Sequence, residues 1–460
     1  MSTPIPQPKP LPIVGNLFDI KPSNTWASLK KLAEDHGEIF QVKILGRTIV
    51  FVAGANLAEE ICDEKRFRKL VSGPIIEIRA AVHDALFTAF HHEESWGIAH
   101  RIIAPKLSPQ TMPDHFYEMR DITTELTQQW KDLGSNNTIT LVEQLNRLNL
   151  EATAYTLFGT RLNGLKGPAH PMLQAMEDST SEAVQRPTRP GIVNWLLHGS
   201  KFKKACATMR KFAAEMVEER KKNPTDRQDL LAAMMNQKDP ETGKPLTDSQ
   251  VIDEIVSMPI GSSTAPCTIT SIVYYLLKNP SVIDAARQEI DSVIGDGDFK
   301  FEHLEQLKYV EGIVREGLRL GNPAPGFNIE PIPSDDKKPI LLGGGKYEVA
   351  HNQGLILILS GVNRDPTLFE DPLTFKPERM MGDSFANLPK AATRWFGNGK
   401  RECIGKHYAW QWLVQTTAQL LREVDFEQVD PHYDVEKAGM DGWFNVRPIG
   451  YQVRVKPRVF

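Results

Sequence analysis

Apolar residues recur at helical spacing through a long central part of the chain, and no other feature constrains the fold as strongly. From residue 55 to about residue 320 the apolar period is close to 3.6, as in HFYEMRDITTELTQQWKDLG and FKKACATMRKFAAEMVEERKKN. The first segment ends in Gly and the second is followed by Pro, and both residues commonly stop helices. We therefore expect a fold built mainly from packed α-helices.

A smaller β part is predicted near both ends of the chain. The segment EIFQVKILGRTIVFVAG alternates apolar and polar residues and turns at Leu45-Gly46, which predicts a β-hairpin over about residues 38–53. Residues 1–20 form a proline-rich arm, and the C-terminal tail has the composition of strands. Since no repeat or low-complexity linker divides the sequence, we expect a single mainly α domain with a small β part over residues 1–460.

Composition excludes several classes of protein. The chain has 54 Lys and Arg against 58 Asp and Glu, a net charge of −4, which gives no reason to expect a nucleic-acid partner. Its longest apolar runs, such as LILILSGV, are far shorter than the about 20 residues of a membrane-spanning helix, so we expect a soluble cytoplasmic protein without a transmembrane anchor. No pair of cysteines has CxxC spacing, which argues against a disulfide framework; the four are Cys62, Cys206, Cys267 and Cys403.

The segment WFGNGKRECIGKH, residues 395–407, places one cysteine among glycines and cations. Neither a four-ligand zinc site nor a disulfide is evident there. A thiolate is a strong axial ligand to haem iron, glycines let backbone N–H groups approach its sulfur, and neighbouring cations can bind haem propionates. The alternative reading of Cys403 is a small buried apolar residue.

The pattern F-x-x-G-x-R-x-C-x-G within this segment resembles the haem-thiolate loop of the cytochromes P450. The resemblance implies the cytochrome P450 fold, in which a long helix crosses the distal face of haem b and Cys403 ligates the iron. It also implies that Trp96 and His100, spaced i, i+4 in EESWGIAHR, hold the propionates together with Arg401. The full set of haem-binding residues that it implies is Lys69, Trp96, His100, Phe396, Arg401 and Gly405.

Two further segments resemble the family in order and spacing. REGLRL contains Glu316 and Arg319 at i, i+3, a spacing that on its own is more typical of a solvated surface pair. About 60 residues later, FKPERM contains Arg379. The resemblance implies that these three residues form a buried charge network behind the haem loop, with a role in folding and haem retention.

The similarity extends over nearly the whole chain and indicates one branch of the family. DLLAAMMNQKDPETGKPL, CDEKRF, DALFTAF and QLKYVEGIVREGLRL resemble the self-sufficient fatty-acid hydroxylases of bacteria and fungi, whose haem domain is fused to an FMN/FAD reductase. This implies electrons from NADPH, delivered through FMN and FAD on a fused or separate reductase. The chain stops at Phe460, about where that haem domain gives way to a linker, which leaves open whether the natural protein continues into a reductase.

The predicted distal helix, DEIVSMPIGSSTAPCTITSIVYYLLKNP, departs from the family pattern. The family carries Ala-Gly, one residue, and then Asp/Glu-Thr-Thr, where the acid and the alcohol relay protons during oxygen activation. Here Gly261 and Thr264 keep their positions, but Ser263 stands where the carboxylate belongs and cannot act as an acid near neutral pH.

The same helix carries further departures. Ile260 replaces a small residue that would face the iron, and Pro259 and Pro266 each remove a backbone donor, so we expect a widened or kinked helix that admits water. One hypothesis is a monooxygenase whose protons come from ordered water and Thr264. A second is a haem-thiolate enzyme with altered oxygen activation, a peroxygenase or a hydroperoxide isomerase or dehydratase. A third hypothesis is a haem sensor or carrier, which would not be an enzyme.

The resemblance also implies a substrate channel. Arg47, on the hairpin, is suited to hold a carboxylate at the channel mouth, although Phe51 replaces the Tyr that normally accompanies it. A fatty acid hydroxylated at subterminal carbons is the default substrate, and a bulkier hydrophobic metabolite is the alternative. The expected pocket residues are Arg47, Phe51, Phe87, Ile260, Ala324 and Phe444.

Overall fold

The structure of the protein, a computed structural model, describes residues 2–458 apart from residues 45, 135–137, 337, 439 and 443. The helices are α1 (Thr25–His36), α2 (Ala55–Ile61), α3 (Pro74–Val82), α4 (Ser95–Ile103), α5 (Met112–Leu133), α6 (Leu141–Phe158), α7 (Pro171–Gln185), α8 (Gly191–Val193), α9 (Gly199–Lys222), α10 (Leu230–Asn236), α11 (Asp248–Ser262), α12 (Thr264–Lys278), α13 (Pro280–Ile294), α14 (Lys308–Gly321), α15 (Leu359–Val362), α16 (Gly382–Ala386), α17 (Lys406–Glu423) and α18 (Val435–Ala438).

The strands form one larger sheet and three small ones. The larger sheet has the order β1-β2-β8-β5-β3, and the others are β4-β12-β9, β10-β11 and β6-β7. The strands are β1 (Ile39–Ile44), β2 (Arg47–Val52), β3 (Phe67–Lys69), β4 (Thr138–Thr140), β5 (Gly326–Pro331), β6 (Ile340–Leu342), β7 (Tyr347–Val349), β8 (Leu355–Ile358), β9 (Val424–Gln428), β10 (Met440–Gly442), β11 (Val446–Pro448) and β12 (Gln452–Pro457).

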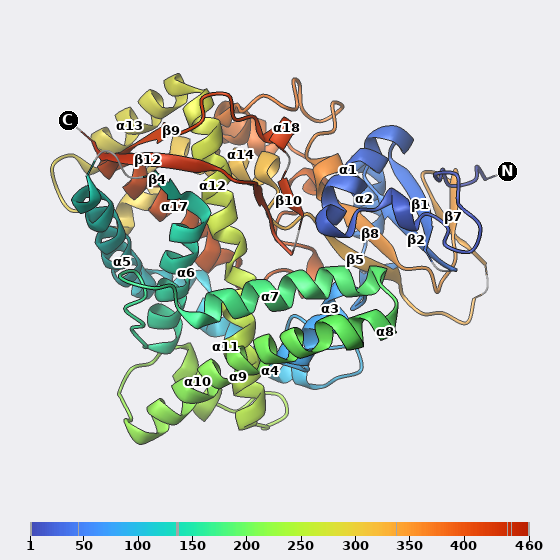
Figure 1. Ribbon diagram of the computed structural model, residues 1–460, viewed down its shortest axis with the longest axis horizontal. Helices are drawn as coiled ribbons and strands as arrows, with labels where there is room; N and C mark the ends of the chain where they lie inside the picture. The colour runs from blue at the N-terminus through green and yellow to red at the C-terminus, as the bar shows by residue number, and fades with distance from the viewer. Residues whose placement is uncertain are drawn as a thin grey trace.

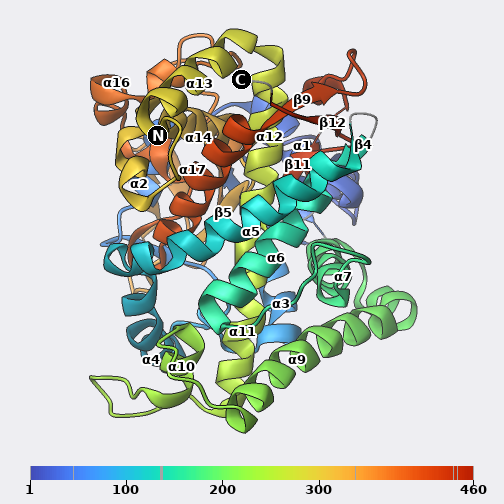
Figure 2. The same cartoon turned by 90° about the vertical axis from the view of Figure 1, so that its left-hand side faces the viewer.

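The helices and the larger sheet occupy different sides of the molecule. Figure 1 shows the larger sheet, with β1 and β2 in blue and β5 and β8 in orange, on one side, the long helices on the other, and α12 running through the middle. After a quarter turn, α11 and α12 stand end to end behind α5 and α6 (Figure 2). The mainly α fold with a small β part is therefore as predicted.

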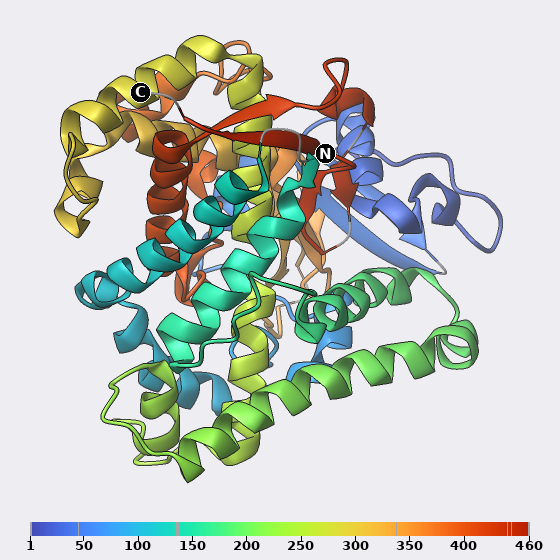
Figure 3. The same ribbon diagram turned by 60° about the vertical axis from the view of Figure 1, so that its left-hand side comes forward.

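Periodic burial explains why the long helices form. In α5 the side chains of Phe116, Met119, Ile122, Leu126 and Trp130 recur every three or four residues and all are buried, so one face of the helix packs into the core. The helices α7 and α9 lie side by side, as Figure 3 shows, and each also has a buried apolar face.

The hairpin expected over about residues 38–53 consists of β1 and β2. They pair antiparallel with Phe40 opposite Phe51, and the turn residue Leu45 lies outside the described residues. β2 then pairs in parallel with β8, with Val50 opposite Leu355. This joins the N-terminal hairpin to a strand far along the chain.

The expected long distal helix is broken into α11 and α12 at Ser263. Pro266 lacks the N–H group that would bond to the carbonyl of Ser262 in a continuous helix, and its ring crowds that carbonyl. Pro259 lies inside α11. The disturbance predicted for this helix takes the form of a break at Ser263, whereas α11 continues through Pro259 for three more residues.

Candidate haem site

One large cavity, about 1260 Å³, lies between the broken distal helix, the Cys403 loop and the larger sheet. Cavities that hold a single drug-sized ligand are usually about 300–1,000 Å³, so this one has room for a large planar group together with a second molecule. Every predicted haem and pocket residue lines it: Arg47, Phe51, Lys69, Phe87, Trp96, His100, Ile260, Ala324, Phe396, Arg401, Cys403, Gly405 and Phe444.

The loop before α17 presents the Cys403 sulfur to this cavity. The Cys403 N–H donates to the Phe396 carbonyl at 2.8 Å, and Gly397 and Gly399 have φ of +91° and +58°, conformations that favour glycine. The side chain lies deep in the protein but is accessible because it opens onto the cavity. Burial raises the pKa of the thiol, whereas a bond from the Gly405 N–H lowers it, as expected for a backbone donor that stabilises a thiolate.

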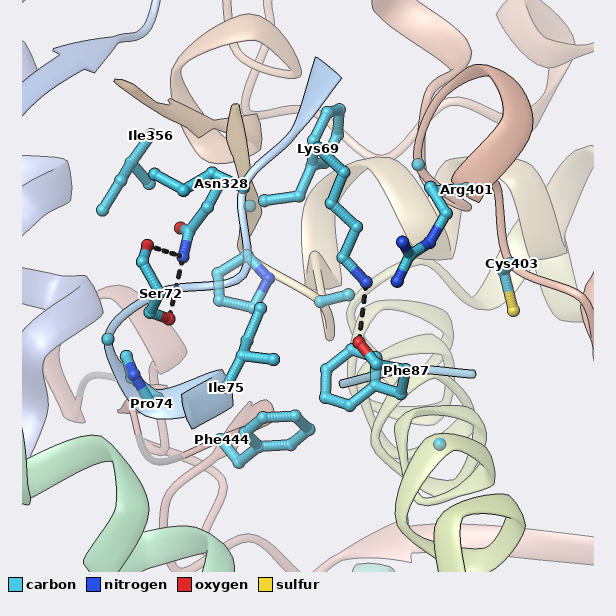
Figure 4. Close-up of a pocket in the computed structure, with 18 of the residues that line it drawn as sticks. Lys69, Ser72, Pro74, Ile75, Phe87, Asn328, Ile356, Arg401, Cys403 and Phe444 are labelled. Carbon is cyan, nitrogen blue, oxygen red and sulfur yellow. Dashed lines mark hydrogen bonds between the residues drawn. The ribbon is translucent and has the colours of Figure 1, made fainter. Parts of the chain in front are cut away.

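Two cations lie near this sulfur at one end of the cavity (Figure 4). The Lys69 ammonium donates to the Phe87 carbonyl at 2.8 Å, and the Arg401 guanidinium donates to the carbonyls of Leu86 and Ala89 at 3.1 and 3.0 Å. Burial lowers the pKa of Lys69 to about 7 and that of Arg401 to about 10. Neither forms an ion pair with a carboxylate among the described residues.

Buried cations without an anionic partner are costly, so this end of the cavity favours an anionic group. Trp96 and His100 extend the same wall: their rings stack at 4.9 Å, and the Arg401 guanidinium lies 5.1 Å from the Trp96 ring. Burial lowers the pKa of His100, which keeps its imidazole neutral at physiological pH. A sulfur ligand beside uncompensated cations matches the thiolate iron and the propionates of haem, so the residues present fit this cofactor.

The predicted charge network behind the loop is assembled. Arg319 donates to both carboxylate oxygens of Glu316 at 2.7 Å, and both side chains are fully buried. Arg379 lies 3.5 Å from the same carboxylate. Arg319 also donates to the carbonyls of Asn363 and Pro372, which ties α14 to the segment that leads towards the Cys403 loop.

On the distal side, Ser263 does not line the cavity. Its hydroxyl donates to the Ile260 carbonyl at 2.7 Å and accepts from the Asn445 amide at 2.6 Å. Thr264 and Gly261 do line the cavity, and the Thr264 hydroxyl donates to the Gly261 carbonyl at 3.1 Å. The sequence predicts that Gly261, Ser263 and Thr264 all take part in oxygen activation. In the structure only Gly261 and Thr264 of these three face the cavity.

The channel from the sheet to the distal helix is mostly apolar. Phe87 and Phe444 meet edge to face with ring centres 6.0 Å apart, and Phe51 stacks on Phe40 at 5.1 Å. Arg47 lies exposed at the outer end, without an ion pair in the part of the chain that the structure describes. The Asn328 amide donates to Ser72, a polar pair between the sheet and α3 that the sequence did not indicate.

A family model described as cytochrome P450 matches residues 5–453. The chain belongs to the cytochrome P450 family. The cofactor of this family is haem, and the cavity, the sulfur and the cations described above fit it. Among the described residues, no helix is both long and apolar enough to cross a membrane.

The curated relatives of this cytochrome P450 include proteins that carry a reductase. A bifunctional cytochrome P450/NADPH–P450 reductase of Acremonium egyptiacum is 38% identical over 94% of this chain and 41% of the relative. A self-sufficient cytochrome P450 monooxygenase of Penicillium expansum is 37% identical over 99% of this chain and 43% of the relative. Another, from Phanerodontia chrysosporium, is 35% identical over 100% of this chain and 43% of the relative. The chain therefore spans about two fifths of the length of these relatives.

Proposed function

We propose that this cytochrome P450 is a haem-thiolate monooxygenase that inserts one oxygen atom of O2 into a C–H bond of an apolar substrate. Bound haem supplies the iron at which O2 is reduced with two electrons from NADPH, so that the second oxygen atom leaves as water. The electrons arrive through FMN and FAD on a fused or separate reductase, in line with the names of the relatives. The observation that carries the proposal is the Cys403 sulfur, which opens onto a large apolar cavity beside two buried cations.

The chain's own residues have separate roles in this reaction. Cys403 ligates the iron, and the Gly405 N–H stabilises its negative charge. Around the propionates, Lys69 and Arg401 supply the counter-charges and Trp96 and His100 form the wall, while Phe396 and Gly405 shape the loop against the haem.

Protons are delivered by residues of the distal helix that face the cavity. The Thr264 hydroxyl faces the cavity and can pass a proton inward while it accepts one from water in the cavity. Gly261 keeps the surface free of side chain at this point. The Ser263 hydroxyl is directed to Asn445 and is not placed for this role.

The proposed substrate is a fatty acid hydroxylated at subterminal carbons. The charge of Arg47 at the outer end of the channel suits a carboxylate, and Phe87 and Phe444 with Ile260 suit an alkyl chain. A bulkier hydrophobic metabolite would use the same apolar wall without Arg47.

The axial ligand is tested by the spectrum of the reduced, CO-bound protein. We expect the red-shifted Soret band of a thiolate-ligated haem in the wild type and in the control variant Cys206→Ala, whose cysteine is buried on α9 away from the cavity. Cys403→His should keep haem but lose the red shift. A red-shifted band that survives in Cys403→His would refute the ligand assignment.

A second candidate function rests on the Ser263 side chain. Because the family's distal acid is replaced and its substitute is bonded to Asn445, the protein could accept peroxide directly or rearrange a hydroperoxide. Turnover should be compared for dodecanoate with NADPH and reductase, for dodecanoate with hydrogen peroxide, and for a fatty-acid hydroperoxide without reductant. Monooxygenation predicts product in the first reaction, and turnover confined to the third would defeat it.

A further inference from the structure

The segment from Leu86 to Ala89, between α3 and α4, crosses one end of the cavity and is held by four ionisable side chains. Arg401 donates to the carbonyls at both ends of the segment, Lys69 donates to the Phe87 carbonyl, and Arg79 donates to the Thr88 carbonyl. The fourth side chain is Glu254 on α11, which accepts a hydrogen bond from the Leu86 N–H at 2.8 Å.

Glu254 is a buried carboxyl with few partners. Its side chain is 1% exposed, and its second oxygen has no hydrogen-bond partner among the described residues. Burial, with a smaller contribution from the carboxylates of Asp253 and Asp84, raises the pKa of Glu254 to about 8. The carboxyl group is thus protonated and neutral at pH 7. Its hydrogen bond from the Leu86 N–H offsets part of the free-energy cost of burying it.

Glu254 has no competing role in cofactor binding, in contrast to Lys69 and Arg401. Lys69 and Arg401 are the residues proposed to hold the propionates, so their bonds to the Leu86–Ala89 carbonyls compete with that role. Glu254 does not line the cavity, and its bond to the Leu86 N–H joins the loop to α11, the helix that carries Ile260 and Gly261 on the distal face.

Phe87 follows directly after the bonded Leu86. Its ring meets Phe444 edge to face at 6.0 Å and the Lys69 ammonium at 4.8 Å, and it lines the cavity. Figure 4 shows Phe87 between Phe444 and the end of the cavity that holds Arg401 and Cys403. A shift of the Leu86 peptide would therefore move the aromatic wall against which a substrate chain stops.

We propose that Glu254 is a positioning residue that fixes the Leu86–Phe87 backbone and thereby determines which carbon of an apolar substrate is oxidised. The inference rests on the proposed function, because the position of Phe87 has a consequence only if the cavity holds substrate. The acceptor oxygen, and not the proton or the charge, is what Glu254 contributes.

Two variants separate the acceptor from the proton. Glu254→Gln keeps an acceptor in the same place and is isosteric with the neutral acid, whereas Glu254→Met keeps the length of the side chain and removes the acceptor. Glu151→Gln is a control for the same substitution at another buried Glu: Glu151 accepts N–H bonds from Leu162, Asn163 and Gly164, pairs with Arg161 at 3.0 Å, and does not line the cavity.

The first readout is amide hydrogen exchange of Leu86 in the haem-loaded protein, which requires no turnover. We expect Glu254→Met to raise the exchange rate of this amide about fivefold, the effect of losing one buried hydrogen bond of ordinary strength. Glu254→Gln and Glu151→Gln should stay within about twofold of the wild type.

The second readout is the distribution of hydroxylated positions formed from dodecanoate with NADPH and reductase. Glu254→Met should change the ratio of the two main products by more than about threefold, and the other two variants should leave it unchanged within about 1.5-fold, since a bond worth about 1 kcal/mol corresponds to roughly fivefold. If Glu254→Met does not take up haem, Glu254→Asp is scored instead, because its shorter side chain keeps the carboxyl but falls short of Leu86.

The results decide between distinct failures. An unchanged Leu86 exchange rate and product ratio in Glu254→Met would overturn the proposal, and so would a product shift in Glu254→Gln as large as in Glu254→Met, which would assign the effect to the proton. If the wild type forms no hydroxylated product with any oxidant, the proposed function fails. In that case the exchange rate still reports whether Glu254 holds Leu86, so the two failures are distinguishable.

Discussion

Removal of the Arg319 guanidinium should cause a large loss of stability. Its side chain is fully buried and donates twice to Glu316 at 2.7 Å. It also donates to the carbonyls of Asn363 and Pro372 at 2.8 and 2.6 Å. In Arg319→Met the volume is roughly kept, but the Glu316 carboxylate stays buried with only the more distant Arg379 at 3.5 Å as a counter-charge.

The expected cost follows from these contacts. Breaking a buried ion pair by removing one partner costs about 3–5 kcal/mol. Each carbonyl that loses its donor adds about 1 kcal/mol. We therefore expect a loss of about 5 kcal/mol or slightly more, a large part of the roughly 5–15 kcal/mol that stabilises a typical domain.

Urea unfolding followed by far-UV circular dichroism measures this loss, and the haem content of the purified protein reports its consequence for the site. Lys308→Met is the matched control on the same helix, because Lys308 pairs with Glu311 at the same i, i+3 spacing, with a nitrogen–oxygen distance of 3.4 Å and a side chain that is 60% exposed. The control should change stability by less than about 0.5 kcal/mol. A loss below about 1.5 kcal/mol in Arg319→Met would refute the reasoning from burial.

Three further changes have expected outcomes. Asn445→Leu removes the partner of Ser263 at 2.6 Å and should lower the free energy of unfolding by about 1 kcal/mol in urea titrations; no change would mean that this bond is not maintained in solution. Arg47→Leu should raise the KM for dodecanoate several-fold and leave the KM for dodecanol unchanged, and an equal rise for both would show that the guanidinium does not bind the carboxylate. The pKa of Glu254 is raised from 4.5 to about 8, so between these values the folded protein holds a proton that the unfolded chain has released, and this group makes stability fall as the pH rises. Unfolding free energies at pH 5 and pH 8 should therefore show the wild type losing stability relative to Glu254→Gln, and a constant difference would contradict the burial of a neutral acid.

Local chemistry explains which parts of the fold and site could be predicted from the sequence. The helical period, the hairpin and the glycine-rich loop around Cys403 are encoded in neighbouring residues, and the structure contains all three. The Glu316–Arg319 pair was predicted as a buried network from the resemblance alone, since its spacing equally fits a solvated pair. Burial of both side chains decides between these readings.

Contacts between distant segments could not be predicted. In the sequence DSQVIDEIVSM, the acids Asp253 and Glu254 have the appearance of exposed residues near the start of a helix. Both are buried: Asp253 accepts from the Arg210 guanidinium of α9, and Glu254 lies under the loop after α3, whose Leu86 N–H supplies its donor. Likewise, nothing local connects Ser263 with Asn445, which lies 182 residues later and directly after the predicted Phe444.

The break in the distal helix explains which hydrogen bonds the polar side chains around it form. Pro266 leaves the Ser262 carbonyl without its helical partner, so the chain turns at Ser263 and the two serine hydroxyls find other bonds. Ser262 accepts from Asn149 on α6, and Ser263 accepts from Asn445 next to β11. The hydrogen bonds of both serines therefore join the distal helix to its neighbours. At the position of the family's acid, Ser263 therefore forms a structural contact with Asn445, whereas the Thr264 hydroxyl lines the cavity and donates to the Gly261 carbonyl across the break.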